Sequence, residues 1–209
     1  MPIIVEPATD AAPVQRPAAY RFEAHQPGDS GRGPLEAFVA QRFAEVHGAQ
    51  VGSFLPNLLA MRDPQGALRC ALGYRGAGAE ALYLEQYLDL PVEQAISAAL
   101  ARRGDAAVGS VERGSIVEVG NLAGRGCRAA LHMVARLPRF LMSHGYRWVT
   151  FTATERVRAV LASFEAPLLD LGPAHPDRLR DGSAEWGSYY RCAPRVMAGW
   201  LPHGLRFQR

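Results

Sequence analysis

Glu118 is the residue whose type and position point most clearly to chemistry. It lies within residues 115–119, a largely apolar run, where burying an ionised carboxylate costs several kcal/mol unless a partner compensates. A fold keeps such a residue for a structural partner or for a reaction. Burial would raise the pKa of the carboxyl towards the range in which it acts as a general base for an amine. A structural carboxylate paired with an Arg is the alternative, and both interpretations stay open.

A glycine-rich turn follows Glu118 and leads into a basic helix. Gly124 and Gly126 leave backbone N–H groups free at the helix N-terminus, where an anion binds well. The helix carries a cationic stripe at helical spacing, made of Arg128, His132, Arg136 and Arg139. An anion site and a plain strand-to-helix turn are both compatible with the glycines, and the stripe is also typical of a solvated helix face.

Two further segments carry side chains that could contact a substrate. Residues 84–89 place Glu85, Gln86 and Tyr87 directly after an expected strand, although a helix cap or a surface loop has the same composition. Residues 186–190 include Trp186 and Tyr189, which would line a cleft or fill the edge of a core. We favour the core for these aromatic residues.

Composition excludes several mechanisms. All 23 basic residues are Arg, so a Schiff-base lysine, a pyridoxal-phosphate anchor and a P-loop lysine are ruled out. Three widely spaced cysteines indicate neither a disulfide framework nor a zinc cluster, which favours the reducing cytoplasm. The six histidines form no metal-binding pattern, so we expect no metal.

The distribution of charge and the hydropathy of the chain limit the classes of partner that it can bind. Residues 1–100 hold seven Arg and eleven acids, whereas residues 101–209 hold sixteen Arg and nine acids, so the second half is the expected anion-binding half. A thioester bearing a nucleotide, an acidic carrier protein, a nucleic acid and an anionic membrane are the candidate anions. No run of about 20 apolar residues predicts a membrane span, and the N-terminus does not read as a signal peptide.

The periodicity of apolar residues predicts a mixed α/β fold. Residues 1–19 read as a flexible leader and 20–209 as one domain. Helices are expected at 35–47, 89–104, 127–144, with a kink or break at Pro138, and 154–164. Strands are expected at 20–23, 58–62, 67–75, 81–85, from 116, at 147–153, 168–171 and 186–192. The N-terminal part of the chain is expected to form antiparallel strands and the part from residue 116 onward a βαβα unit. Together they give a mixed sheet with helices on both faces.

Four segments, taken in order, resemble the thermostable hemolysin family. They are residues 84–89, 116–123, 148–154 and 186–190, and the resemblance covers about residues 20–200. The name of that family records a phenotype and implies no mechanism.

The order of parts is also similar to that of homoserine-lactone autoinducer synthases and, more distantly, of GNAT-type N-acyltransferases. That similarity implies a GNAT-like, mostly antiparallel central sheet and an acyl thioester as donor. The synthases have Asp, Gly, Gly and Arg in a hairpin before the central strand, an order matched here by Asp63, Gly66, Gly73 and Arg75. Their central strand carries Glu and, three residues on, Arg; here Asn121 follows Glu118, which implies a different acyl acceptor.

The resemblance implies roles for individual residues. Glu118 would be the base or amine clamp, backbone N–H groups near Asn121 would polarise the thioester carbonyl, and Arg75 would hold an acceptor carboxylate or a carrier phosphate. The donor arm would lie on Val119, Leu122, Gly124, Arg125, Gly126, Arg128, Phe151 and Thr152. The acceptor would contact Glu85, Gln86, Tyr87, Trp186 and Tyr189. The short turn departs from the usual GNAT pattern, so acyl carrier protein and coenzyme A both stay open as donors.

The leading hypothesis is therefore a cytoplasmic acyltransferase that moves an acyl group from a thioester to a small-molecule amine, with no tightly bound cofactor and no nucleic-acid partner. A membrane-damaging protein is the rival, since a cationic helix suits a membrane surface. A non-catalytic binding module on the same fold is the third option.

Overall fold

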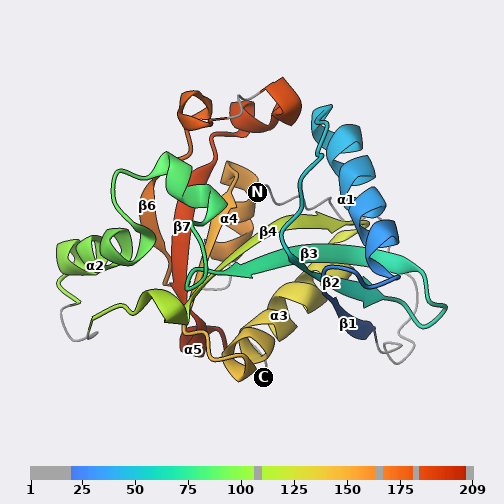
Figure 1. Cartoon of the computed structure of the whole chain (residues 1–209), viewed down its shortest axis with the longest axis horizontal. Helices are drawn as coiled ribbons and strands as arrows, with labels where there is room; N and C mark the ends of the chain where they lie inside the picture. The colour runs from blue at the N-terminus through green and yellow to red at the C-terminus, as the bar shows by residue number, and fades with distance from the viewer. Residues whose placement is uncertain (1–19, 106–109, 163–166, 181–183, 206–209) are drawn as a thin grey trace.

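A computed structural model describes residues 20–105, 110–162, 167–180 and 184–205 (Figure 1). The expected leader, residues 1–19, lies outside them. Seven strands form one sheet: β1 (Arg21–His25), β2 (Asn57–Arg62), β3 (Leu68–Gly76), β4 (Ile116–Gly124), β5 (Trp148–Ala153), β6 (Leu169–Pro173) and β7 (Arg195–Trp200). Their order across the sheet is β1-β2-β3-β4-β5-β7-β6, and every neighbouring pair is antiparallel except β4 and β5. The predicted mixed, mostly antiparallel sheet is confirmed.

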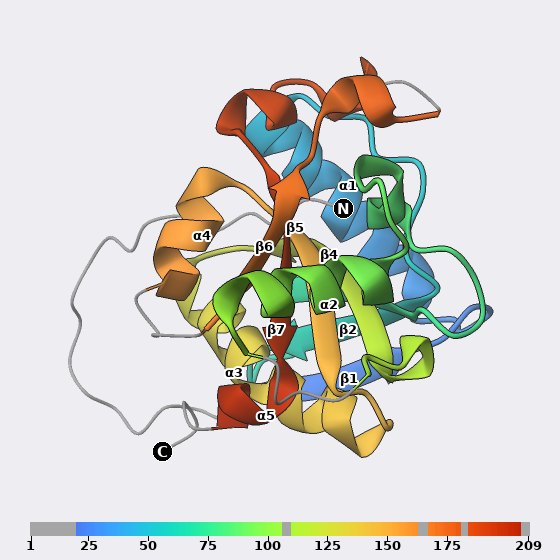
Figure 2. The same ribbon diagram turned by 90° about the vertical axis from the view of Figure 1, so that its left-hand side faces the viewer.

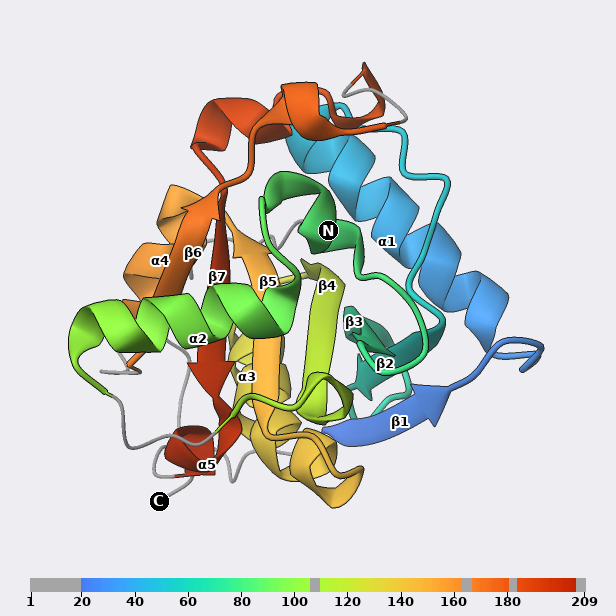
Figure 3. The ribbon, with the colours of Figure 1, turned by 60° about the vertical axis from the view of Figure 1, so that its left-hand side comes forward.

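Helices cover both faces of this sheet. They are α1 (Arg32–His47), α2 (Val92–Arg103), α3 (Cys127–Ser143), α4 (Glu155–Ala162) and α5 (Leu201–Gly204). Side chains alternate along β4, so Ile116 packs in one core with α1 and α2, and Val117 in a second core with α3. Figure 2 and Figure 3 show α2 lying across the sheet on the side opposite α3.

Two expected strands are wrong. Residues 81–85 lie mainly in a 3₁₀ helix, η1 (Tyr83–Tyr87), because the Leu82 N–H donates to the Glu85 carboxylate at 2.7 Å and closes a turn. Residues 186–192 fall in the 3₁₀ helices η4 (Ala184–Trp186) and η5 (Tyr189–Cys192). The left-handed φ of +52° at Gly187 is incompatible with an extended strand there.

One strand lies outside the expected set: β7 completes the sheet between β5 and β6. Helix α3 runs continuously through Pro138, so the helix has no break there, and the alternative of a kink stays a prediction. The Pro138 ring packs against α5, where a Cβ added to Gly204 would lie only 2.8 Å from Pro138 Cγ.

Candidate active site

The two parallel strands at the centre of the sheet, β4 and β5, are paired along only part of their length. β4 and β5 are paired from Ile116 with Trp148 as far as Glu118 with Thr150, yet β4 continues to Gly124 and β5 to Ala153. From Val119 and Phe151 onward the two strands share no ladder hydrogen bonds. A split of this kind leaves backbone N–H and C=O groups that an extended ligand can pair with.

A bulge interrupts β4 at Asn121, just beyond the point where β4 and β5 separate. Between the pairs Gly73–Gly120 and Ala71–Ala123, β4 advances three residues while β3 advances two. Asn121 has a left-handed φ of +51°, a conformation that Asn tolerates better than most residues. Its Oδ1 accepts the backbone N–H of Leu55 at 3.0 Å. The bulge is thus fixed by the type of this one residue.

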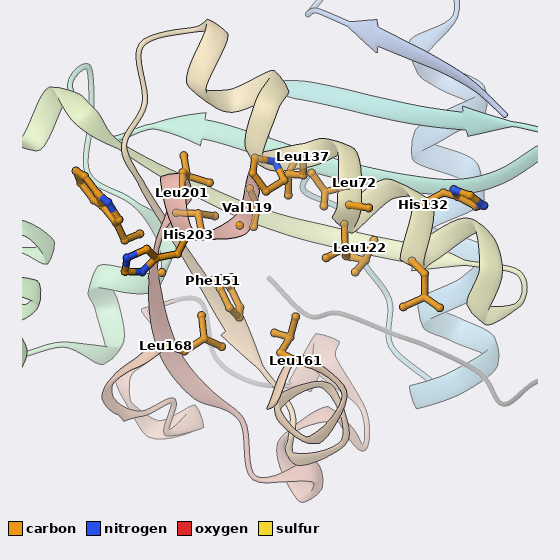
Figure 4. Close-up of a pocket in the computed structure, with 18 of the residues that line it drawn as sticks. Leu72, Val119, Leu122, His132, Leu137, Phe151, Leu161, Leu168, Leu201 and His203 are labelled. Atoms are coloured by element: carbon orange, nitrogen blue, oxygen red, sulfur yellow. The ribbon is translucent and has the colours of Figure 1, made fainter. Parts of the chain in front are cut away.

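The split opens onto an apolar cavity of about 630 Å³ on the α3 face of the sheet (Figure 4). This volume falls within the range of small-molecule sites. Its apolar walls include Leu72, Val119, Leu122, Leu131, Leu137, Val149, Phe151, Leu161, Leu168 and Leu201. Arg128, His132 and His203 are the ionisable residues of the lining. The cavity therefore suits a long apolar chain.

Glu118 lies on the opposite face of β4 and is fully buried. Its Oε2 accepts the N–H of Tyr83 at 2.8 Å and its Oε1 the N–H of Leu84 at 3.1 Å. Burial raises the pKa of this carboxyl, and the two backbone N–H groups and Arg75 oppose the rise without cancelling it. Among the described residues, Glu118 thus has backbone partners in η1 and no ion pair with an Arg.

Arg75 faces Glu118 directly across the β3–β4 ladder. Its Nε lies 3.4 Å from a Glu80 carboxylate oxygen, and its side chain is partly exposed. A cation beside the buried carboxylate, with one side open to solvent, can meet an anionic group of an acceptor.

Glu85 organises the η1 turn. Its carboxylate accepts the N–H groups of Leu82 and Val92 and pairs with the guanidinium of Arg113 at 2.7 Å. Burial opposes ionisation of Glu85, but these partners outweigh it and leave its pKa below the ordinary value. Arg113 also binds Glu93 at 2.8 Å. The carboxylate predicted to contact a substrate is thus engaged in holding the turn that serves Glu118.

The other predicted acceptor residues lie within the same turn or pack close to it. Gln86 accepts the N–H of Arg180 at 3.1 Å, and the hydroxyls of Tyr87 and Tyr190 lie 2.7 Å apart. Trp186 and Tyr189 are buried, with ring centroids 6.0 Å apart, in the core shared with α1 and α2. The core interpretation of these two aromatic residues matches their position.

The residues predicted for the donor arm divide among three places. Val119, Leu122, Arg128 and Phe151 line the cavity. Gly124 ends β4, Gly126 caps α3 with a φ of +84°, and the Arg125 N–H already donates to Arg69 O at 2.8 Å. Thr152 is only 1% exposed, and its hydroxyl has no hydrogen-bond partner among the described residues. The structure thus brings together the cavity group but engages part of the turn elsewhere.

Sequence reasoning missed much of the cavity wall. The apolar side of α3, together with Leu161, Leu168, Leu201 and His203, was not singled out. The cationic stripe of α3 drew attention to its charged side. The apolar side could have been found from Leu131, Val134, Ala135 and Pro138, which recur at helical spacing.

The stripe divides between the outer side of α3 and the cavity, because Arg128 and His132 also line the cavity. Arg128, Arg136 and Arg139 are exposed, whereas Met133, Leu137 and Leu141 are buried against the sheet. Within the described ranges, no helix is long and apolar enough to cross a membrane. Nor does the described part of the chain gather three His, Cys, Asp or Glu side chains where they could hold a metal ion.

Comparison with known proteins gives a family and a fold. The family model described as "Thermostable hemolysin" matches residues 25–205. No curated protein matches the sequence. Among solved structures, FeeM, an N-acyl amino acid synthase from uncultured soil microbes, is 12% identical with a TM-score of 0.55, over 90% of this chain and 94% of its own.

Two acyl-homoserine lactone synthases share the same fold. LasI is 15% identical with a TM-score of 0.55, over 88% of this chain and 89% of its own. The coenzyme A-dependent synthase BjaI, solved with SAM and isopentyl-CoA, is 10% identical with a TM-score of 0.54, over 91% of this chain and 88% of its own. Both resemblances expected from the sequence are confirmed at the level of family and fold.

Proposed function

Because this chain belongs to the thermostable hemolysin family and shares its fold with N-acyltransferases, we propose that it transfers an acyl group from a thioester to an amine. One observation carries the proposal: the split between β4 and β5 opens directly onto a cavity that is apolar and large enough for a fatty chain.

The donor arm would pair with the exposed strand backbone. The amides of a pantetheine arm can add to the edges left by β4 beyond Glu118 and by β5 beyond Thr150, as an extended peptide adds to a sheet. The acyl chain would then enter the cavity past Val119 and Leu122. Burial of each methylene stabilises the complex by about 0.8 kcal/mol.

The bulge would polarise the thioester carbonyl. A left-handed residue such as Asn121 turns neighbouring backbone N–H groups out of the regular ladder. Donors held in this way stabilise the oxyanion that forms when an amine nitrogen attacks the carbonyl carbon. The carbon–sulfur bond then breaks, and the sulfur leaves as a thiolate that takes up one proton, so the products are the amide and the thiol.

Glu118 would receive the proton of the attacking amine. Its raised pKa makes it a stronger base than an exposed carboxylate, and each oxygen accepts one backbone N–H and so retains a lone pair. Because the side chain is sealed from solvent, the amine must approach through the split, which begins one residue beyond Glu118. Arg75, on the neighbouring strand, would hold an anionic group of the acceptor.

The donor can be acyl carrier protein or coenzyme A. Arg128 lies exposed at the N-terminal end of α3 and also lines the cavity, so it would meet the phosphate of either donor. The exposed Arg136 and Arg139 on the same helix would add attraction for an acidic carrier protein.

The test uses the full chain with acyl carrier protein thioesters and coenzyme A thioesters of several chain lengths, together with a mixture of amines from cell extract. The proposal predicts thiol release that depends on the amine, and an amide whose mass equals acyl donor plus acceptor minus the thiol. Release of free fatty acid alone, or no turnover with either donor class, would contradict it. Leakage of liposomes without any thioester would favour a direct membrane function instead.

A further inference from the structure

Helix α3 presents exposed arginines that have no acidic partner in the described part of the chain. They are Arg128, Arg136 and Arg139, and residues 127–143 contain neither Asp nor Glu. Arg136 donates to the Tyr20 carbonyl at 3.3 Å, which leaves its charge uncompensated. Elsewhere arginines pair with carboxylates, as Arg32 does with Glu36 at 2.7 Å. Like charges gathered on one helix repel one another, so this cluster indicates an anionic partner.

An apolar strip runs along α3 beside these arginines. Leu131 is 40% exposed, which is unusual for a leucine on a folded domain, and Val134, Ala135 and Pro138 are half-buried. All four side chains also line the cavity. Because they face the cavity and still contact solvent, the cavity is open along this side of α3. Its mouth therefore has an apolar rim with cations next to it.

The combination of charge and apolar surface favours one kind of partner. A second copy of the chain, placed on this face by a two-fold axis, would set arginines against arginines. An acidic carrier protein satisfies the arginines, but its charge does not explain the open apolar strip. A bilayer of anionic lipids satisfies both features, because its phosphates bind guanidinium groups in a bidentate manner and its acyl region accepts apolar side chains.

A bilayer would also ease the release of a product with a long chain. The amide keeps its acyl chain in the cavity, and each methylene that must leave for water lowers the release equilibrium about fourfold. A cavity mouth that lies on lipid avoids this penalty, because the chain passes from one apolar environment to another. This release step rests on the proposed function, whereas the docking surface does not.

We infer that this side of α3, which carries Arg128, Leu131, Ala135, Arg136 and Arg139, docks on the surface of an anionic bilayer and turns the open cavity towards the lipid. The arginines bind lipid phosphates, and Leu131 enters the boundary between headgroups and acyl chains. The helix lies on the surface and does not span the bilayer, in keeping with its length and charge.

Sedimentation with lipid vesicles measures this docking without requiring turnover. The full chain should bind vesicles of phosphatidylcholine mixed with phosphatidylglycerol, bind phosphatidylcholine vesicles much more weakly, and dissociate from the mixed vesicles as salt is added. Arg136→Gln combined with Arg139→Gln should weaken binding roughly 25-fold, because each arginine near an anionic surface contributes about fivefold. Leu131→Gln should weaken it roughly threefold or more, as burial of its exposed part allows.

Arg102→Gln combined with Arg180→Gln is the matched control, since it removes the same charge from the other side of the sheet. Arg102 is exposed on α2, which lies opposite α3 (Figure 2 and Figure 3), and the exposed Arg180 contacts Gln86 of η1. This variant should keep most of the binding to mixed vesicles. The Leu131→Gln variant changes no charge, so its loss separates apolar contact from electrostatic attraction.

Two results would overturn the inference and leave the proposed function intact. One is an equal loss of binding in both double variants, which would reduce the effect to net charge. The other is no binding to mixed vesicles; if an acyl carrier protein then binds in a manner that depends on Arg136 and Arg139, the face belongs to that protein. Docking on vesicles without acyl transfer from either donor class would overturn the proposed function alone.

Discussion

The backbone N–H of Tyr83 donates to Oε2 of Glu118 over 2.8 Å, although 35 residues separate the two in sequence. With the second bond from Leu84, it joins the centre of β4 to the η1 turn. The same carboxylate therefore has a structural duty and a proposed chemical one. Variants of Glu118 alone cannot separate these two roles. In Glu118→Gln, the amide NH₂ group would face one of the two backbone N–H groups, so that hydrogen bond would be lost as well.

The protonation of Glu118 should be visible in stability. Its folded-state pKa lies above the ordinary value of 4.5, so between these two pKa values the folded protein binds more protons than the unfolded chain. This contribution to the free energy of unfolding is full below pH 4.5 and is lost as pH rises through the folded pKa. Urea unfolding across this range should show the fall in wild type and not in Glu118→Gln. Glu112→Gln, at an exposed site, is the control and should keep it.

Catalysis by Glu118 should exceed the effect of loosening its turn. Glu118→Gln removes the base and should lower kcat on the order of 100-fold or more. Glu85→Gln weakens the Arg113 pair that holds η1 but leaves the Glu118 carboxylate in place, so its loss of kcat should be much smaller. The pH–rate profiles of both variants decide the matter: equal losses with an unchanged profile would reduce Glu118 to a positioning residue.

The bulge at Asn121 should depend on its backbone conformation and on its side chain. Asn121→Ala forces alanine to adopt a φ of +51°, which costs about 1–2 kcal/mol, and leaves the buried Leu55 N–H without its acceptor, which costs about 1–3 kcal/mol. Asn121→Gly relieves only the first cost and should be about 1 kcal/mol more stable than the alanine variant. Chemical denaturation measures both, and equal stabilities would show that the left-handed conformation is not required.

The cavity should set the length of the acyl chain. Leu161→Trp adds volume to a wall residue, so it should shift the preferred donor towards shorter chains, while Ala159→Trp on the exposed side of α4 should leave the preference unchanged. Competition between thioesters of different length, followed by mass spectrometry of the products, measures this. If the preferred chain length shifts only in the Ala159→Trp variant, or in neither variant, the acyl chain does not lie in this cavity.

Much of the framework could be predicted from the sequence because local signals agree with the fold. The Asp63–Gly66 reversal joins β2 and β3, and Gly48 and Gly104 end α1 and α2 with left-handed φ values, as their types predict. The strand around Glu118 and the helix after Gly126 were also predictable, since each follows a clear change of periodicity.

The remaining parts depend on contacts that a local pattern does not contain. β7 is buried between two strands and reads as a short apolar run, Val196 to Gly199, without alternation. The local sequence around Glu85 is typical of a surface or substrate-facing residue, because its partner Arg113 lies 28 residues away in sequence. The cavity likewise forms only where α3, α4 and α5 meet the split, so the sequence of no single segment predicts it.

A crystal structure of the protein with a non-reactive thioether analogue of an acyl donor would test the central claim most directly. The account predicts the pantetheine arm between Val119–Gly124 and Phe151–Ala153, the carbonyl beside the Asn121 bulge, and the acyl chain inside the cavity against Leu122 and Phe151. An analogue bound elsewhere, with the split closed and the cavity empty, would contradict it.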